Sequence, residues 1–121
     1  MAQLRHDYQK FKAFNTEVLV IVPNGLKMIK RYTNHNATPY PILSDKGAQV
    51  AAQFAIDTKQ IILLKAFTPT IFLVDTGGLI RYASYGSSYI KEPDNREPLA
   101  ILAQLVHNPT NYTLTYTSQF Q

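Results

Sequence analysis

Apolar side chains at the beginning of the chain recur at helical spacing and then give way to an unbroken apolar run. The first pattern is made by Leu4, Tyr8, Phe11 and Phe14. Spacings of four and three residues place them along one face of a helix from about residue 2 to residue 14. The run EVLVIVP (17–23) is short and rich in β-branched residues, which is typical of a strand covered on both faces. The pattern therefore predicts a helix followed by a central, parallel strand.

Two further helices are predicted before residue 57, each with a polar residue in position to cap it. Asn24 stands before a helix that ends near Thr33, and Asp45 before a shorter helix, KGAQVAAQFAI (46–56). The residues expected to point inward are Leu26, Ile29 and Tyr32 in the first helix and Val50 and Phe54 in the second. The segment ATPYPILSD (37–45) contains two prolines, so an extended piece at a sheet edge is expected there.

A hairpin is predicted in the middle of the chain. TIFLV (70–74) has the pattern of a buried strand, Asp75 to Gly78 that of a turn, and LIRYASY (79–85) that of the antiparallel partner. Because a strand rather than a helix follows the glycines, they do not form a phosphate-binding loop. In the preceding connection, 57–67, Ile61 to Leu64 are four consecutive apolar residues. They fit a short strand or loop packed in the core, or a patch that contacts a partner.

A last helix and an alternating strand complete the chain. The helix starts near Asp94 or Pro98, carries EPLAILAQLV (97–106) and stops at Asn108-Pro109. In the tail, Tyr112, Leu114 and Tyr116 alternate with Thr113, Thr115 and Thr117. This alternation predicts a strand with one buried face, more often an edge strand than a central one. The expected organisation is one globular domain at 1–109 and a strand-like tail at 110–121.

Composition narrows the chemistry. The 121 residues contain no cysteine, which excludes a disulfide, a thiolate metal site and a thiol nucleophile of the chain's own. His6, His35 and His107 share no ligand spacing, so no metal is expected, and nothing indicates a cofactor. No apolar run approaches the ~20 residues of a membrane span, and the first residues lack the apolar region of a signal peptide. A cytoplasmic protein without membrane contact is expected.

Positive charge changes this picture little. The net charge is +4, and Lys27, Lys30 and Arg31 fall on one predicted helix. The twelve basic residues are otherwise scattered among eight acidic ones, without an arginine-rich run. This pattern favours a solvated helix face over a nucleic-acid-binding patch.

The order of elements is similar to that of the peroxiredoxin-like family of alkyl hydroperoxide reductases and thiol-specific antioxidant proteins. The segments that carry the resemblance are AQLRHDYQKFKAFNTEVLVIVP (2–23), YPILSDKGAQVAAQFAI (40–56) and TPTIFLVDTGGLIRY (68–82). The resemblance covers roughly residues 2–106. It implies a thioredoxin-like fold, a three-layer α/β/α arrangement with a mixed central sheet, in which the first strand is missing.

The resemblance also identifies what this sequence lacks. In the family, the first strand ends in a loop that carries the redox cysteine at the start of a helix, where helix amides stabilise the thiolate. Residue 1 falls within the corresponding helix, so the resemblance places that strand and cysteine upstream of it. Peroxiredoxins also use an arginine near the entrance of the hairpin strand, but residues 65–70 contain none and Arg81 is not at a matching position. No peroxidase mechanism can be written for these residues.

By the same resemblance, substrate- or partner-binding residues gather at the hairpin entrance. Thioredoxin-like domains place a cis-proline opposite the redox cysteine, where the preceding residue offers its backbone to an extended segment. Here that proline would be Pro69, preceded by Thr68, with Phe67 beside them. The alternative is a trans-proline that simply begins an edge of the strand.

Two functions from different classes follow. One is a thiol-dependent antioxidant oxidoreductase whose cysteine is encoded upstream, and the other is a non-catalytic binding or assembly module derived from the family. An in-frame upstream segment with a strand and a cysteine loop would favour the first. A hydrolase built on Ser44 or Ser84 with His35 is disfavoured, because no Gly-x-Ser-x-Gly motif occurs.

The missing strand suggests self-association. In the resembling fold it lies between the strands that match VLVIV (18–22) and TIFLV (70–74). An open gap there would leave several backbone groups unpaired, at about 1–3 kcal/mol each if buried. Either the flanking strands pair directly or a strand is supplied, for which YTLTYTS (112–118) of this chain or of a second copy is suited. We therefore expect a homo-oligomer, a dimer with the tail at a sheet edge or across subunits; a protein partner is the alternative.

Overall fold

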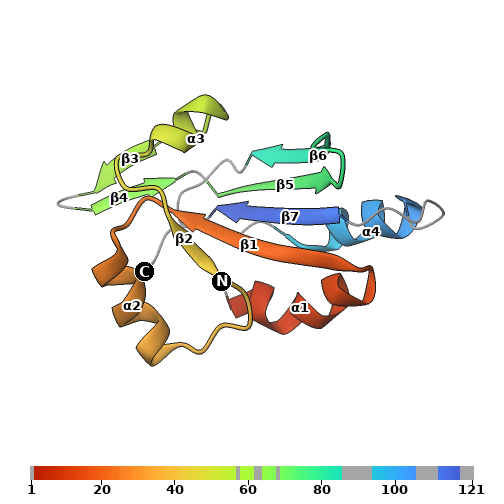
Figure 1. Ribbon diagram of the computed structural model, residues 1–121, viewed down its shortest axis with the longest axis horizontal. Coiled ribbons are helices and arrows are strands. Elements are labelled where there is room, and N and C mark those ends of the chain that lie inside the picture. Colours follow the sequence, from red (N-terminus) through yellow and green to blue (C-terminus); the bar gives the residue numbers. More distant parts are fainter. Residues whose placement is uncertain are drawn as a thin grey trace.

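The computed structural model describes residues 2–56, 58–61, 64–67, 69–85, 94–105 and 112–117 (Figure 1). For β3, β4 and β7 it describes the backbone alone. The elements are α1 (Ala2–Ala13), β1 (Thr16–Val22), α2 (Leu26–His35), β2 (Ile42–Ser44), α3 (Gln49–Gln53), β3 (Thr58–Ile61), β4 (Leu64–Phe67), β5 (Thr70–Asp75), β6 (Ile80–Tyr85), α4 (Arg96–Leu105) and β7 (Tyr112–Thr117). Every helix and strand predicted from the sequence pattern within these residues is present.

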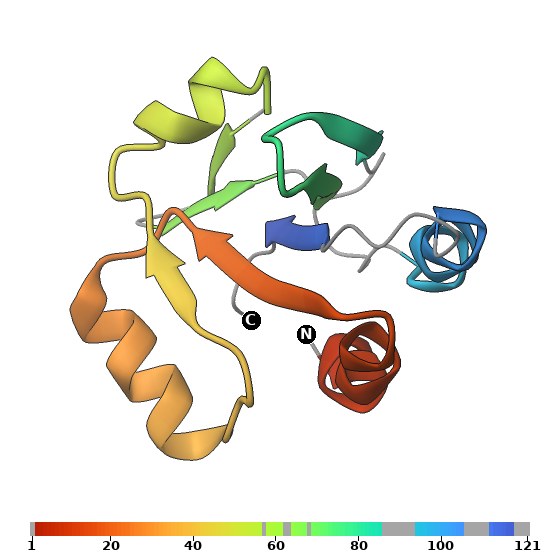
Figure 2. The ribbon, with the colours of Figure 1, turned by 45° about the vertical axis from the view of Figure 1, so that its right-hand side comes forward.

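A five-stranded mixed sheet organises the molecule, in the order β2-β1-β7-β5-β6. β1 is parallel to both of its neighbours, as its unbroken apolar pattern predicts, whereas β5 is antiparallel to both of its own. Figure 2 shows α3 on one side of the sheet and α1 and α4 on the other, with α2 beside the β2 end. The three-layer α/β/α arrangement with a mixed central sheet is therefore confirmed.

The C-terminal strand lies in the centre of this sheet, and the prediction of an edge strand is wrong. β7 pairs along its whole length with β1 on one side and with β5 on the other. β7 thus fills the position between these two strands that the resemblance leaves open, and the strand that fills it comes from this chain. Placing Tyr112–Thr117 ahead of α1 would give the strand–helix–strand order of the resembling fold. Self-association stays a prediction, but the open gap that motivated it is filled.

The register of β7 explains why its alternating pattern does not predict its central position. Leu114 pairs with Val18 and Leu73, which belong to the large core, whereas Thr115 pairs with Leu19 and Phe72, which do not. Alternation in a strand reports how apolar the two faces of the sheet are. Whether a strand is central depends on which other strands pair with it, and the pattern of one strand does not contain that information.

The face covered by α1, α2 and α4 holds the large core. Its buried apolar residues are Leu4, Phe11, Val18, Val20, Val22, Ile29, Tyr40, Ile71, Leu73 and Leu102. Phe11 and Leu4 are completely buried, as the helical spacing of the first segment predicts. These residues come from α1, α2, α4, β1, β5 and, with Tyr40, the connection between α2 and β2. This face therefore joins sequence segments far apart and dominates the hydrophobic stabilisation.

On the opposite face, beside α3, the residues whose side chains are described form a much smaller core, made of Ala48, Ala51, Ile56 and Phe72. Val50 and Phe54, both predicted to point inward, are each 43% exposed. Leu26, at the start of α2, was also predicted inward and is 74% exposed. The inward prediction is wrong for these three residues: the five-residue helix α3 leaves Val50 and Phe54 partly uncovered. Leu26 is the first residue of α2, where its side chain faces solvent.

The two predicted helix caps have different outcomes. The Asp45 carboxylate accepts hydrogen bonds from the Val50 and Ala51 amides at 3.1 and 2.9 Å, so it stabilises the start of α3 as predicted. Asn24 does not cap α2. Gly25 stands at the N-cap without a side-chain hydrogen bond, while the buried Asn24 amide donates to Met28 Sδ.

The hairpins form as the local sequence dictates. In the β5–β6 turn, the Asp75 carboxylate accepts from the Gly77 and Leu79 amides, both at 2.9 Å, and Gly78 has the positive φ of 85° that glycine adopts readily. β3 and β4 form a separate two-stranded antiparallel sheet. Ile61 is the last residue of β3 and Leu64 the first of β4, but their side chains are not described, so both alternatives for the apolar run Ile61 to Leu64 stay predictions.

Candidate functional site

The carboxyl ends of the parallel strands define one edge of the sheet, where α/β proteins commonly bind ligands. One register row crosses all five strands at this edge. It consists of Leu43, Ile21, Thr117, Thr70 and Tyr85, in that order. The predicted entrance of the hairpin strand, at Thr70, is therefore in the same row as the ends of β1 and β7. We call this row the carboxyl edge.

The predicted binding residues reach this edge only in part. Pro69 is buried and directly precedes Thr70, which is buried as well. Phe67 instead ends β4, where its backbone pairs with Thr58 in the small second sheet. Thr68 lies outside the described residues, and so does the geometry of the bond between Thr68 and Pro69. The structure thus brings Pro69 to the carboxyl edge, and the role assigned to Thr68, Pro69 and Phe67 stays a prediction.

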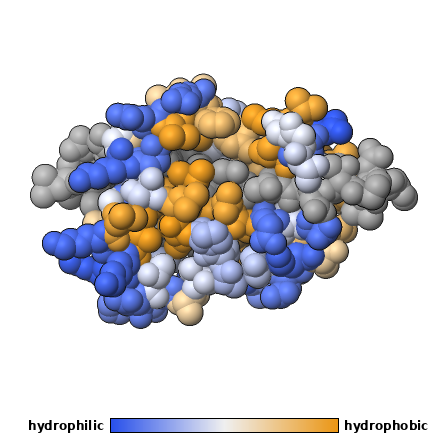
Figure 3. All heavy atoms as spheres, in the orientation of Figure 1, coloured by the Kyte–Doolittle hydropathy of each residue, from blue (hydrophilic) through white to orange (hydrophobic). Residues whose placement is uncertain are grey.

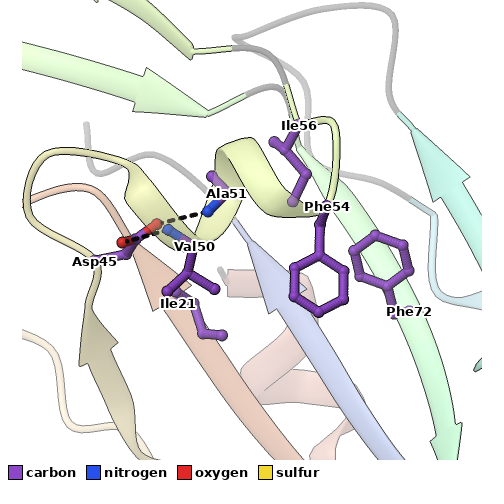
Figure 4. A pocket seen from close by; sticks show the side chains of 7 residues that line it. All are labelled: Ile21, Asp45, Val50, Ala51, Phe54, Ile56 and Phe72. Atoms are coloured by element: carbon purple, nitrogen blue, oxygen red, sulfur yellow. Dashed lines mark hydrogen bonds between the residues drawn. The ribbon is translucent and has the colours of Figure 1, made fainter.

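A small apolar cavity of about 30 Å³ opens between α3 and the sheet, close to the carboxyl edge. Its lining residues are Ile21, Asp45, Val50, Ala51, Phe54, Ile56 and Phe72 (Figure 4). The carboxylate of Asp45 is engaged by the α3 amides, as the dashed lines show. The cavity therefore offers shape and apolar contact, and its one charged lining group is already hydrogen-bonded within the protein.

Two aromatic rings, Phe54 and Phe72, line this cavity, and a third ring, Tyr85, packs against Phe72. The Phe54 and Phe72 ring centroids are 5.4 Å apart, and Tyr85 packs edge-on against Phe72 at 5.6 Å. The Tyr85 hydroxyl donates a 2.9 Å hydrogen bond to the Phe54 carbonyl oxygen. This bond fixes the end of β6 to the end of α3. The aromatic group gives the thin side of the molecule a defined local structure.

A larger, shallow hollow of about 760 Å³ lies on the other side of Asp45, between the start of α2 and the β2–α3 turn. Its lining residues are Gly25, Leu26, Lys27, Leu43, Ser44, Asp45 and Lys46. The sequence analysis missed Leu43 and Lys46 and placed Leu26 inside the core. A signal was present, because Leu26 and Lys27 directly follow Pro23-Asn24-Gly25 and therefore occupy a helix start, where side chains readily face solvent.

Among the residues whose side chains are described, Arg81 does not lie at this edge. Arg81 pairs with Asp75 at 3.0 Å, and Asp75 lies at the other end of β5 from Thr70. Amide hydrogen bonds from Leu79 and Gly77, together with the Arg81 charge, outweigh partial burial and lower the pKa of Asp75. This pair stabilises the hairpin turn. That Arg81 has no catalytic role stays a prediction.

The two histidines that the structure describes belong to different helices and contact different groups. His6 contacts the Asp7 carboxylate at 3.1 Å on α1, and His35 Nδ1 lies 2.9 Å from the Arg31 carbonyl oxygen at the end of α2. His107 is outside the described residues. Across the part of the chain that the structure describes, no group of three or more metal-binding side chains occurs. Among the same residues, no helix is both long and apolar enough to cross a membrane.

Comparison with known proteins gives a family match. The model of the AhpC/TSA family matches residues 1–83, which span α1 to the middle of β6. No curated protein matches the chain. The matched region contains the carboxyl-edge residues Leu43, Ile21 and Thr70, together with Pro69. It does not contain β7, the strand that completes the sheet between β1 and β5.

Proposed function

We propose that this chain, which belongs to the AhpC/TSA family, acts as a non-catalytic binding module built on the thioredoxin-like fold. Membership in this family indicates that the chain is related to thiol-dependent redox proteins. The activity of such proteins depends on a thiolate that attacks a peroxide or disulfide, and the 121 residues contain no cysteine. The proposal therefore separates the fold, which is retained, from the chemistry, which these residues do not supply.

One observation carries the proposal: β7 occupies the position that the family's first strand would take. It is parallel to β1 and antiparallel to β5, and its last residue, Thr117, pairs with Ile21 and Thr70 at the carboxyl edge. A strand supplied from elsewhere would have to displace β7 before its following loop could bring a cysteine to Pro69. Displacing β7 would break its backbone hydrogen bonds to both β1 and β5.

The remaining chemistry of the edge suits binding. Its described side chains include the exposed Leu43, the half-buried Ile21 and the exposed Tyr85, beside an apolar cavity. Exposed apolar side chains that adjoin a preformed cavity favour contact with another molecule.

A direct assay tests the catalytic part of the proposal. The purified chain, incubated with hydrogen peroxide and dithiothreitol, is expected to consume peroxide no faster than buffer. A cysteine-dependent peroxidase assayed in parallel checks the reagents. Turnover by this chain that disappears when one of its residues is replaced would show a catalytic group and overturn the proposal.

The family match itself favours a second candidate, a thiol-dependent oxidoreductase whose strand and cysteine are encoded before residue 1. The two candidates differ in a measurable way. The gene sequence upstream of residue 1 either encodes, in frame, a strand followed by a cysteine loop, or it does not. If it does, and the longer chain consumes peroxide, the oxidoreductase is correct and the binding module is not.

A further inference from the structure

We infer that the exposed and half-buried apolar residues between α2 and α3 form a docking surface for an acidic, leucine-rich segment of a partner protein. The surface consists of Leu26, Leu43, Ile21, Val50 and Phe54, with Lys27 and Lys46 at its border; we call it the α2–α3 surface. The inference rests on the proposed binding function and names the place and the chemistry of the binding.

The α2–α3 surface is continuous. Leu43 and Ile21 are register partners on adjacent strands, so they lie side by side. Leu43 and Leu26 line the larger hollow, whereas Ile21, Val50 and Phe54 line the small cavity, and Asp45 lines both. Figure 3 shows hydrophobic residues gathered in the middle of the molecule, over the part of the view where β1 and β2 lie.

The apolar residues of this surface are unusually exposed to solvent. Leu26 is 74% exposed, Leu43 45%, and Val50 and Phe54 43% each. Each Å² of apolar surface left in water forgoes about 25 cal/mol of stabilisation. Apolar residues scattered singly need no explanation, but a contiguous group beside a hollow is typical of an interaction site.

Charge decides the kind of partner. Lys27 and Lys46 line the hollow, and within the described chain neither has an ion-pair partner. The first turn of α2 contains no acidic residue, and no side chain caps its amides. The one carboxylate in the hollow, Asp45, is bound to the start of α3. The border of the surface is therefore positively charged.

A second copy of this chain fits the surface poorly. A two-fold symmetric contact would bring the lysines of one copy toward those of the other, and like charges facing each other oppose association. An acidic segment gains from the same lysines, and its leucines can cover Leu26 and Leu43. Complementary charge also accelerates the encounter and makes it depend on salt.

Two labelled peptides with the same leucines test the inference. In one peptide leucine alternates with glutamate, and in the other leucine alternates with lysine. The glutamate peptide is expected to bind at least about tenfold more tightly, because only it complements Lys27 and Lys46. Its addition should shift the amide NMR signals of residues 25–27, 43–46 and 50–54. Equal affinity for the two peptides, or shifts centred elsewhere, would overturn the inference.

Variants separate the contributions of apolar contact and charge. Leu26→Ser combined with Leu43→Ser, and Lys27→Glu combined with Lys46→Glu, are each expected to weaken binding of the glutamate peptide by about tenfold or more. The control is Lys30→Glu, an exposed lysine on the same helix that does not line the hollow. It should change affinity by no more than about twofold. Equal losses in Lys30→Glu would indicate unspecific attraction and refute the assigned surface.

Folding and self-association are checked on the same samples. Circular dichroism and the amide spectrum establish that each variant is folded, and all exchanged positions are exposed. If concentration alone shifts the signals of the α2–α3 surface, a second copy occupies it and the acidic partner is wrong. The peroxide assay tests the non-catalytic function independently of peptide binding. If the chain neither consumes peroxide nor binds the glutamate peptide, the docking surface is wrong and the proposed function is unaffected.

Discussion

The two faces of the sheet differ in what they do with apolar side chains. The face covered by α1, α2 and α4 is called here the α1–α4 face. On it these helices cover β1 and β5, and residues such as Phe11, Leu73 and Leu102 have no exposed surface. On the α3 face, a five-residue helix covers the sheet, and Val50 and Phe54 are nearly half exposed. The same kind of residue therefore stabilises the fold on one face and remains accessible on the other. The proposed binding function would thus use the side of the sheet that contributes less to stability.

β7 lies in the centre of the sheet that both faces share, so a change in this strand should have the largest effect on stability. Thr115→Pro removes a ladder amide from the central strand, where proline is not tolerated. We expect this variant to lose its cooperative unfolding transition, because the lost ladder is comparable in free energy with a domain stability of about 5–15 kcal/mol. Urea titration followed by circular dichroism measures this, with Thr115→Ser as the control that keeps the amide. A normal transition in Thr115→Pro would place β7 outside the sheet centre.

Two phenylalanines measure the difference between the faces directly. Phe11→Ala should lower the free energy of unfolding by about 3–5 kcal/mol, the usual range for a phenylalanine removed from a closed core. Phe54→Ala should lower it by only about 1 kcal/mol, because 43% of the side chain is already exposed. Chemical denaturation of the two variants provides the comparison. Similar losses in both would mean that the α3 face is as important for stability as the α1–α4 face.

A pH titration extends the comparison to polar groups. Asp7 is buried on α1, which disfavours its charged form, but hydrogen bonds from Lys10, His6 and Asn95 outweigh burial and lower its pKa. A carboxyl whose folded-state pKa is lowered stabilises the fold above its unfolded pKa of about 3.9, and this stabilisation is lost as pH falls through the folded-state value. We expect Asp7→Asn to be less stable than the parent protein at pH 7 and the difference to vanish below the lowered pKa.

The matched control for Asp7 is Glu17→Gln. Glu17 lies on the other face of β1 and forms an exposed ion pair with Lys12. Exposed pairs contribute about 0–1 kcal/mol, so this variant should alter the free energy of unfolding little between pH 7 and pH 3. If urea titrations at several pH values gave the same profile for both variants, the buried hydrogen bonds of Asp7 would not be the cause.

The smallest effect is expected at Leu26. Leu26→Ser should change the free energy of unfolding by no more than about 0.5 kcal/mol, because the leucine is mostly in water in the folded chain. Thermal unfolding of the variant beside the parent protein checks this. A loss above about 2 kcal/mol would show that Leu26 is part of the core, and the α2–α3 surface would then have to be redefined without it.

Much of the local structure could be predicted from the residues alone. The spacing of Leu4, Tyr8 and Phe11 specifies a helix with one buried face, and the unbroken run 17–23 specifies a strand with apolar neighbours on both faces. Asp45 and the Asp75 turn act within a few residues of their own positions. Such features depend on backbone geometry and short-range hydrogen bonds, which a short stretch of sequence contains.

The candidate site was predictable only in part, because its residues come from separate segments. Pro69 could be assigned through resemblance, but nothing near Leu26 or Leu43 in the sequence indicates that these two leucines share one hollow. Both have the apolar character of core residues, and both line a hollow that the helix start of α2 and the end of β2 form together. Exposure is a property of the surrounding elements, and sequence patterns describe only the residue itself.

The sequence by itself determined the helices, the strands of the main sheet, the β5–β6 hairpin and the absence of a thiol among the 121 residues. Only the tertiary structure decided that Tyr112–Thr117 lies between β1 and β5, and that one face of the sheet is closed while the other is open. The physical reason is the range of the interactions. Helix periodicity and turns depend on neighbouring residues, whereas strand order depends on which distant backbone groups satisfy one another's hydrogen bonds.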